Sequence, residues 1–310
     1  MDENDHIIAV RVENISKSYN DTKALDSISF KVRENELYGL IGPDGSGKST
    51  MFRILTTLLL PDVGHATIFE YDVIKDYKKL RRITGYMPGK FSLYQDLSVE
   101  ENLEFFATVF GTTIDENYHL IKDIYAQIEP FKKRPAGKLS GGMKQKLALS
   151  CALIHKPEIL ILDEPTTGVD AVSRKEFWDM LIRLKEMGIT ILVSTPYMDE
   201  AALCDRVSLI QNGSILQTDT PENIVSSFDR NLFSIRGKDK SRLVRDLRMF
   251  EKSHSVFLFG QDIHLTTRER YIKPDEVKNY LYEKGFNDIE IKKIDPGIED
   301  CFMELMKTND

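Results

Sequence analysis

The sequence predicts an α/β fold with a parallel central sheet, followed by a smaller α+β domain. Residues 37–41 form an apolar, strand-like stretch that leads through a glycine-rich segment into a helix-like stretch at 51–59. Residues 158–162 form a second apolar run, which is typical of a strand buried on both faces of a parallel sheet. Strand-like and helix-like runs alternate up to about residue 225, where the pattern changes.

Before residue 158, the predicted elements are an antiparallel pair, the start of the central sheet and a helical insertion. Residues 7–32 alternate apolar and polar side chains in two runs, which predicts two antiparallel strands with one buried face. The insertion is expected between about residues 89 and 156, and Ser98 with Glu101 predicts a capping box at its first helix. The other elements predicted here are a helix at 51–59, a turn at 61–64, a strand at 65–70 and helices at 98–110, 114–128 and 140–155.

After residue 158 the chain completes the sheet and then enters a second domain. We place the first domain at residues 1–225 and an accessory domain at residues 226–310. The accessory domain predicts the order β-α-β-β-α-β with a final helix from residue 297. The predicted elements are a helix at 173–187, a strand at 189–195, a short helix at 198–204, accessory strands at 232–235, 256–259, 263–266 and 289–294, and accessory helices at 240–250 and 274–284.

The composition is that of an ordinary globular protein, with 41% apolar and 29% charged residues among 310. The formal net charge of −7 argues against a nucleic-acid partner, and the basic run at 75–82 is interpreted as a solvated helix face. Cys151, Cys204 and Cys301 are scattered, which indicates buried thiols in a reducing cytoplasm. The acidic N-terminus is unlike a signal peptide, and no apolar run approaches the ~20 residues that span a bilayer. A role at a membrane is therefore expected at its cytoplasmic face.

A phosphate-binding loop follows the first apolar strand. Its glycines let backbone N–H groups turn inward around phosphates, and the helix that follows adds a positive end. Lys48 supplies a mobile charge for the β- and γ-phosphates, and Ser49 supplies a hydroxyl for Mg²⁺. A glycine-rich surface turn is the alternative, which the flanking strand and helix disfavour. The nucleotide-binding residues predicted here are Gly42, Pro43, Asp44, Gly45, Ser46, Gly47, Lys48, Ser49 and Thr50.

Two acids stand at the end of the second apolar strand, where parallel sheets expose their ligand sites. Asp163 is the candidate to hold Mg²⁺ beside Ser49, directly or through water. Glu164 is the candidate general base, which would polarise the water that attacks the γ-phosphate. A simple turn is the alternative, and the phosphate loop in the same chain makes it the weaker one.

A second anion-binding element opens the helix predicted at 140–155. A serine and two glycines at a helix start present backbone N–H groups and the positive end of the helix dipole. With the phosphate loop and the Asp-Glu pair in this order, the chain resembles the nucleotide-binding subunit of an ATP-binding cassette (ABC) transporter. The resemblance implies that these residues are the signature that contacts the ATP of a partner subunit: Leu139, Ser140, Gly141, Gly142 and Met143.

The resemblance covers roughly residues 7–225 and implies a P-loop NTPase fold with an antiparallel β subdomain and a helical subdomain. In that family two subunits pair head to tail, so each ATP lies between one phosphate loop and the other signature. The implied ligands are ATP and Mg²⁺, and the implied partners are a second ABC ATPase subunit and integral membrane permease subunits. Tyr19 stands where an aromatic ring stacks on adenine, although an ordinary half-buried tyrosine remains the alternative. Residues 167–170, ending in Asp170, resemble the D-loop.

The branch of the family is indicated by three further segments. Residues 85–88, 91–103 and 295–302 are similar to the ABC-2 type exporters of the drug-resistance branch. That resemblance implies that the insertion, particularly residues 89–110, docks on a permease.

The chain departs from the family at two sensor positions. Gly89 stands where the family has a glutamine near Mg²⁺ and the attacking water, and Pro196 stands where it has a histidine near the γ-phosphate. Proline has no side-chain donor and no backbone N–H. His155 does not replace that histidine and is interpreted as a helix-end residue. We therefore expect ATP binding with slow turnover at this chain's own loop, and a heterodimer in which its intact signature serves a competent partner; a homodimer stays open.

Two other function classes remain alternatives to the exporter ATPase. A non-hydrolysing regulatory nucleotide-binding protein would also fit the loss of both sensors. A soluble ABC ATPase of translation or DNA repair is disfavoured, because such proteins usually carry two cassettes, coiled-coil insertions or basic surfaces. The transported substrate is not encoded in this chain, since the family resemblance assigns specificity to the permease.

Overall fold

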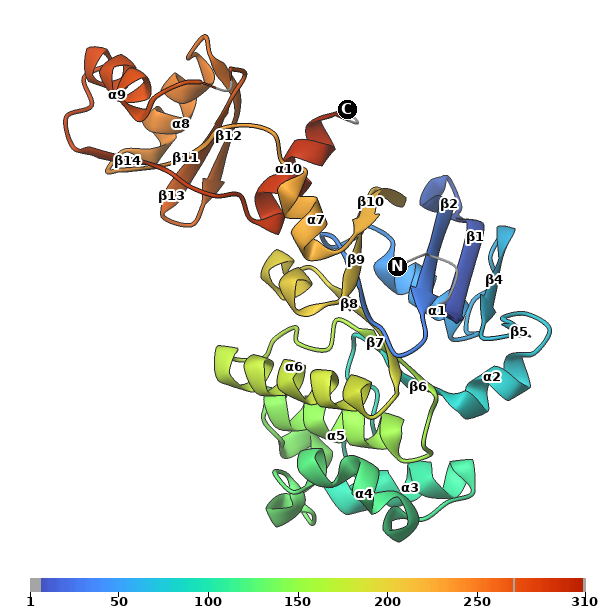
Figure 1. Ribbon diagram of the computed structural model, residues 1–310. Helices are drawn as coiled ribbons and strands as arrows, with labels where there is room; N and C mark the ends of the chain where they lie inside the picture. Colours follow the sequence, from blue (N-terminus) through green and yellow to red (C-terminus); the bar gives the residue numbers. More distant parts are fainter. Residues whose placement is uncertain (1–6, 270, 309–310) are drawn as a thin grey trace. The chain divides into compact units, whose positions relative to one another are not determined.

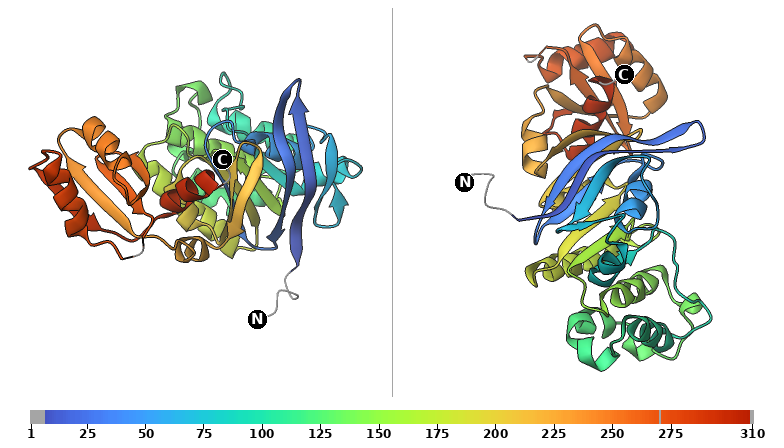
Figure 2. Two further views of the ribbon diagram at one scale, coloured as in Figure 1. Left: turned by 90° about the horizontal axis from the view of Figure 1, so that it is seen from above. Right: turned by 90° about the vertical axis from the view of Figure 1, so that its right-hand side faces the viewer.

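The computed structural model describes residues 7–269 and 271–308, which divide after Pro221 into two compact units (Figures 1 and 2). The sequence placed this boundary at residue 225. Within the described residues, no helix combines the length and the apolar character needed to cross a membrane.

A six-stranded sheet forms the centre of the first unit, in the order β10-β9-β3-β8-β7-β6. Strands β3 (Leu37–Ile41), β7 (Ile159–Asp163) and β8 (Thr190–Thr195) are parallel and buried at every residue, as their apolar sequences predict. Their carboxyl ends align, since Ile41 pairs with Thr195 and Asp163 with Ser194. Three strands of this sheet were not predicted: β6 (Thr84–Met87), β9 (Arg206–Gln211) and β10 (Ser214–Asp219).

The antiparallel subdomain is a second sheet, in the order β2-β1-β4-β5. The predicted pair is confirmed, with Val12 opposite Phe30, and its buried face packs on Met51 and Phe52 of the helix α1 (Lys48–Leu55). That helix ends earlier than the predicted residue 59, because Thr57 adopts a left-handed conformation with φ +62°. The strands are β1 (Ile8–Tyr19), β2 (Thr22–Arg33), β4 (Val63–Ile68) and β5 (Tyr71–Asp72).

The helices of the insertion lie together at the end of the first unit opposite the antiparallel sheet (Figures 1 and 2). The predicted capping box is confirmed: Ser98 Oγ accepts the N–H of Glu101, whose carboxylate accepts the N–H of Ser98 at 2.7 Å. The helices here are α3 (Val99–Phe110), α4 (Ile114–Tyr125) and α5 (Gly141–Leu153); elsewhere in this unit lie α2 (Tyr77–Ile83), α6 (Ala171–Glu186) and the 3₁₀ helix η4 (Met198–Leu203).

The second unit confirms the predicted β-α-β-β-α-β order. Its antiparallel sheet has the order β12-β13-β11-β14, and α8 and α9 pack on one face around Phe233 and Leu265. The elements are α7 (Pro221–Ser226), β11 (Leu232–Gly237), α8 (Lys240–Arg248), β12 (Ser253–Phe259), β13 (Asp262–Thr267), α9 (Pro274–Glu283), β14 (Ile289–Lys293) and α10 (Ile298–Thr308).

Candidate nucleotide site

The glycine-rich loop lies between β3 and α1, and its conformation requires glycine. Gly45 and Gly47 have φ angles of +78° and +108°, in the region that residues with a Cβ rarely adopt. At Gly42 a Cβ would stand 2.1 Å from the carbonyl oxygen of Ile210, so the close approach of β9 also excludes a side chain there. The loop is therefore a tightly specified turn that points backbone groups inward.

Lys48 connects this loop to the acids at the end of β7. Its side chain is 2% exposed, and Nζ donates to the carbonyl oxygens of Gly42 at 2.8 Å and Pro43 at 2.9 Å. The same Nζ lies 3.2 Å from Oε1 of Glu164. Two motifs that are more than a hundred residues apart thus meet at one ammonium group.

Ser194 on β8 holds both acids in place. Its hydroxyl donates to Oδ1 of the buried Asp163 at 2.6 Å. The N–H of Glu164 donates to the carbonyl oxygen and to Oγ of Ser194, at 3.1 and 3.0 Å. These bonds stabilise Glu164 at φ +48°, a conformation that is costly for a residue with a side chain. The sequence analysis missed Ser194, whose only signal is a polar residue within an apolar strand.

The donors and acceptors of this site fit a nucleotide with Mg²⁺. Oγ of Ser46 is buried in the loop without a hydrogen-bond partner, as expected of a donor that faces a ligand. No group of three or more His, Cys, Asp or Glu among the described residues could hold a metal ion. Ser49 and Asp163 remain the candidate Mg²⁺ ligands, since this ion commonly takes one carboxylate and completes its shell with phosphate and water oxygens.

The two sensor positions flank this site. A Cβ at Gly89 would stand 3.2 Å from the carbonyl oxygen of Asp163 and 3.6 Å from its Oδ2. Pro196 directly follows Thr195, whose carbonyl oxygen accepts the N–H of Gly42 at 3.2 Å. Gly89 therefore lies against Asp163, the candidate metal ligand. Thr195, the residue before Pro196, lies against the phosphate loop.

The segment around Pro196 is fixed by a buried carboxylate. Glu200 is 1% exposed and accepts hydrogen bonds from the hydroxyls of Thr195 and Thr166. The guanidinium of Arg174 lies 3.8 Å from the same carboxylate and stacks on the ring of Tyr197. Glu200 therefore ties the end of β8 to the residues that follow the Asp-Glu pair.

The signature is packed on the D-loop. Ser140 is the N-cap of α5, and its Oγ accepts the N–H of Met143 at 3.4 Å. A Cβ at Gly142 would stand 2.7 Å from Oγ of Ser173, and one at Gly141 would stand 3.0 Å from the carbonyl oxygen of Gly168. Glycine at both positions thus permits the close contact. Leu139, just before the N-cap, is buried.

Asp170 is the N-cap of α6. Its Oδ1 accepts the N–H groups of Ser173 and Val172, and the bond from Ser173 is the main reason that the pKa of this carboxyl lies below its usual range. Tyr19 lies at the tip of the β1–β2 hairpin with 43% of its surface exposed, which leaves its ring accessible. Asp44 at the loop apex is exposed, and Thr50 in α1 is partly exposed.

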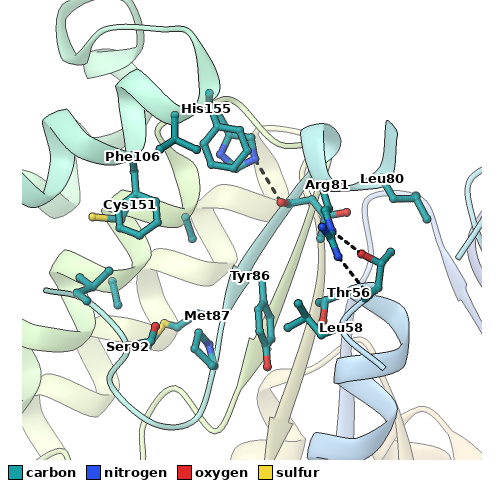
Figure 3. A pocket seen from close by; sticks show the side chains of 18 of the residues that line it. Thr56, Leu58, Leu80, Arg81, Tyr86, Met87, Ser92, Phe106, Cys151 and His155 are labelled. Carbon is teal, nitrogen blue, oxygen red and sulfur yellow. Dashed lines mark hydrogen bonds between the residues drawn. The ribbon is translucent and has the colours of Figure 1, made fainter. Parts of the chain in front are cut away.

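A predominantly apolar groove of about 500 Å³ lies in the first unit, between α1, α2, β6 and the insertion (Figure 3). One wall is α5 itself, through Ala148, Cys151 and Ala152. At its edge His155 stacks on Phe110 with ring centroids 3.8 Å apart, and its Nε2 donates to the carbonyl oxygen of Thr84 at 3.2 Å. Burial lowers the pKa of His155 to about 4.

The groove is lined by Leu55, Thr56, Thr57, Leu58, Leu80, Arg81, Thr84, Tyr86, Met87, Pro88, Ser92, Leu93, Phe106, Val109, Phe110, Ala148, Cys151, Ala152 and His155. The sequence analysis predicted a docking surface at residues 89–110 but not a groove that also includes α1, α2 and α5.

Comparison with known proteins places these features in a family context. Residues 25–167 match the family described as ABC transporter. The probable multidrug ABC transporter ATP-binding protein YbhF of Escherichia coli (strain K12) is 36% identical over 291 residues, which are 92% of this chain and 50% of that protein. The Nod factor export ATP-binding protein I of Sinorhizobium fredii is 32% identical over 307 residues, which are 96% of this chain and 86% of that protein.

A solved structure shares the fold. It is the dimeric structure of a post-hydrolysis state of an ATP-binding cassette bound to ADP and Pi, with a TM-score of 0.62 and 26% sequence identity. The match covers 68% of this chain and 98% of that one. The chain thus spans half the length of YbhF but most of the Nod factor export protein.

Proposed function

Because this chain belongs to the ABC transporter family, we propose that it is the ATP-binding subunit of an ABC-2 type exporter at the cytoplasmic face of the membrane. The names of two relatives support this role, since one is a probable multidrug ABC transporter ATP-binding protein and the other a Nod factor export ATP-binding protein. The chain spans only half of YbhF, so the activity and partners of that whole protein are proposed for this chain by analogy.

The observation that carries the proposal is the meeting of Lys48 and Glu164, with Nζ and Oε1 3.2 Å apart. It supports one site in which phosphate binding and water activation are adjacent. Lys48 would exchange its loop carbonyls for β- and γ-phosphate oxygens, which are stronger acceptors because they are charged. Glu164 would accept a proton from the attacking water.

Ser49 and Asp163 would hold Mg²⁺, and Ser194 orients the carboxylate of Asp163. When bound, the ion would neutralise charge that develops on the transferred phosphoryl group. The residues of this chain would position the phosphates, the water and the metal-binding carboxylate.

A second ABC ATPase subunit is proposed to complete the site. The exposed N-terminus of α5, capped by Ser140, would donate N–H groups to an ATP held by the partner. The dimeric cassette with ADP and Pi supports this arrangement by its likeness to the first unit.

We further propose that this chain is the catalytically weaker half of a heterodimer. Gly89 leaves no side chain beside Asp163, and Pro196 offers no donor beside the loop. Loss of one group that stabilises transition-state charge costs roughly 10²–10³ in rate. The retained Glu164 supports slow rather than absent hydrolysis.

The apolar groove is the proposed docking site for an integral membrane permease. It combines residues of the predicted docking segment, such as the 61% exposed Val109, with apolar side chains from elsewhere, such as the 58% exposed Leu58. Exposed apolar side chains gathered in one groove are typical of an interaction site.

The testing experiment is steady-state ATP hydrolysis by the purified chain, with nucleotide binding measured in parallel and Glu164→Gln as the control. We expect ATP binding by both proteins and slow hydrolysis that the variant abolishes. Addition of a competent partner cassette should raise hydrolysis.

The outcomes separate the alternatives. Rapid turnover by the chain alone would contradict the weaker-half proposal, and failure to bind ATP would contradict the whole function. Binding without turnover, even with a partner cassette and permease present, would instead support the non-hydrolysing regulator.

A further inference from the structure

The outer face of α2 concentrates positive charge on an otherwise acidic protein. The cations of residues 75–82 are all exposed, although the chain as a whole carries a formal net charge of −7. Tyr77 is also exposed, at 40%, and Lys78 and Arg81 lie over its ring. We call this surface the α2 basic face, formed by Lys75, Lys78, Lys79, Arg81 and Arg82.

Neighbouring carboxylates neutralise this face only in part, through the charge interaction of Asp72 with Lys75 and the pairing of Asp76 with Lys79. Oδ1 of Asp72 accepts the N–H groups of Ile74 and Lys75, and Oδ2 of Asp76 accepts the N–H of Asp72. These acids therefore mainly fix the turn that starts α2. Among the described residues, only Lys79 of this face has a carboxylate oxygen within 4.0 Å, that of Asp76 at 3.9 Å.

Arg81 is held in place by uncharged groups. Its Nε and a terminal nitrogen donate to Oγ1 and the carbonyl oxygen of Thr57, at 2.8 and 3.1 Å. Its charge is thus oriented but not cancelled.

The α2 basic face borders the groove. Leu80 and Arg81 of α2 both line the groove, with Leu80 on the buried side of the helix. The 58% exposed Leu58, just after α1, lines the groove as well (Figure 3). A permease segment seated in the groove would therefore bring this helix close to the bilayer that holds the permease. This step rests on the proposed function.

We propose that the α2 basic face binds the anionic headgroups of the membrane leaflet next to the permease. Clustered lysine and arginine side chains beside a membrane are attracted to anionic lipid, and tyrosine favours the headgroup level. With seven residues, α2 is too short to insert, so the contact is peripheral and sensitive to salt. The proposed partner of the α2 basic face is thus a lipid surface. The alternative partner is an acidic protein segment, and the test below distinguishes the two.

The test is co-sedimentation of the full chain with vesicles. Vesicles of phosphatidylcholine and phosphatidylglycerol in equal parts are compared with vesicles of phosphatidylcholine alone, at low ionic strength and at about 1 M salt. The α2 variant removes three cations of the face, Lys78→Gln/Lys79→Gln/Arg82→Gln. The matched control removes three exposed cations of α4 and α6, Lys122→Gln/Lys175→Gln/Arg183→Gln.

We expect wild type and control to bind the anionic vesicles at low salt only. The α2 variant should bind them about a hundredfold more weakly, because each of the three cations contributes roughly fivefold near an anionic surface. All three proteins should bind ATP equally, which shows that they are folded.

Equal binding by the two variants would overturn the proposal, because net charge alone would then explain the attraction. No binding of wild type to anionic vesicles would also overturn it and would leave an acidic protein segment as the partner. ATP binding, measured in the same samples, distinguishes either failure from a failure of the proposed function.

Discussion

At the residue scale, position 89 decides what faces the carboxylate of Asp163, the candidate metal ligand. A Cβ there would stand 3.2 Å from the carbonyl oxygen of Asp163, so a side chain needs only a small shift, and the φ of Gly89 is not among the positive values. The absence of a side chain at this position is therefore not dictated by the backbone.

A side chain at position 89 can therefore be tested together with one at position 196. The double variant Gly89→Gln/Pro196→His should raise ATP hydrolysis by up to about 10²-fold, because it restores two groups beside the phosphates. Single-turnover rates with a partner cassette present would measure the gain. No gain in the double variant, with ATP binding retained, would show that other features limit the rate; Glu164→Gln in the same background is the control.

Ser194 supports a second prediction. Ser194→Ala would leave Oδ1 of the buried Asp163 without its donor and remove one acceptor of the Glu164 N–H. Loss of such a positioning bond typically costs 10–100-fold in metal affinity or activity. Titration of hydrolysis against Mg²⁺ should show a weaker apparent affinity, and Ser194→Thr, which keeps a hydroxyl, should recover most of it. An unchanged Mg²⁺ dependence in Ser194→Ala would contradict this role.

The residues that the sequence could identify are those whose chemistry is written in a local pattern. Lys48 and Ser140 stand in runs of fixed spacing, so the order of residues alone predicted them. Ser194 has no such pattern. Its role arises from the alignment of β7 with β8, which is three-dimensional.

At the element scale, the errors lie where short strands depend on neighbours. The hairpin of β9 and β10 was missed although Asn212 and Gly213 form its turn, with φ angles of +46° and +75°. An Asn-Gly pair between strand-like runs was an available signal. In contrast, β6 has four residues and contains Gly85, so only its pairing with β7 defines it.

The edge of the groove gives a third prediction, through the pKa of His155, which burial lowers to about 4. An unfolded histidine has a pKa of about 6.5, so between these values the unfolded chain binds the extra proton and stability falls as pH falls. From pH 6.5 to pH 5 this amounts to about 2 kcal/mol. Urea unfolding should show that the free energy of unfolding of His155→Gln falls less over this pH range than that of the wild type, by the same amount. An equal fall in both proteins would contradict a buried, neutral histidine.

The groove also gives a fourth prediction. Val109→Glu should abolish association with the permease, because a carboxylate in an apolar interface loses its hydration. Val109 is 61% exposed, so the fold should be unaffected. The matched control Leu258→Glu changes an apolar residue of the second unit with similar exposure, 54%, and should still associate in a pull-down. Equal recovery of both variants would argue against the groove as the docking site.

At the scale of the whole molecule, two units with separate cores should unfold separately. The core around Phe52 belongs to the first unit, and the core around Phe233 belongs to the second. This division was visible in the sequence as a change from alternating α/β runs to a β-α-β-β-α-β order. The groove could not be seen in the sequence, because residues from five separate segments form it.

The fifth prediction uses this division. Saturating Mg·ATP should stabilise the first unit only, by about 2.7 kcal/mol at a hundred times the dissociation constant. Differential scanning calorimetry should then show one transition that moves upward with nucleotide and one that does not. A single transition that moves as a whole would show that the units unfold together.

The helix α5 has one further consequence. Its N-terminus carries the signature, and its residues from Ala148 onward line the groove, so the proposed contacts with a partner ATPase and with a permease lie on one helix. About ten residues separate them, or roughly 15 Å. A tilt of about 5° at the groove would move the signature by roughly 1 Å, enough to break hydrogen bonds whose length tolerance is smaller. Docking of a permease on this subunit would therefore tilt α5 and change the contacts of its signature with the nucleotide held by the neighbouring subunit.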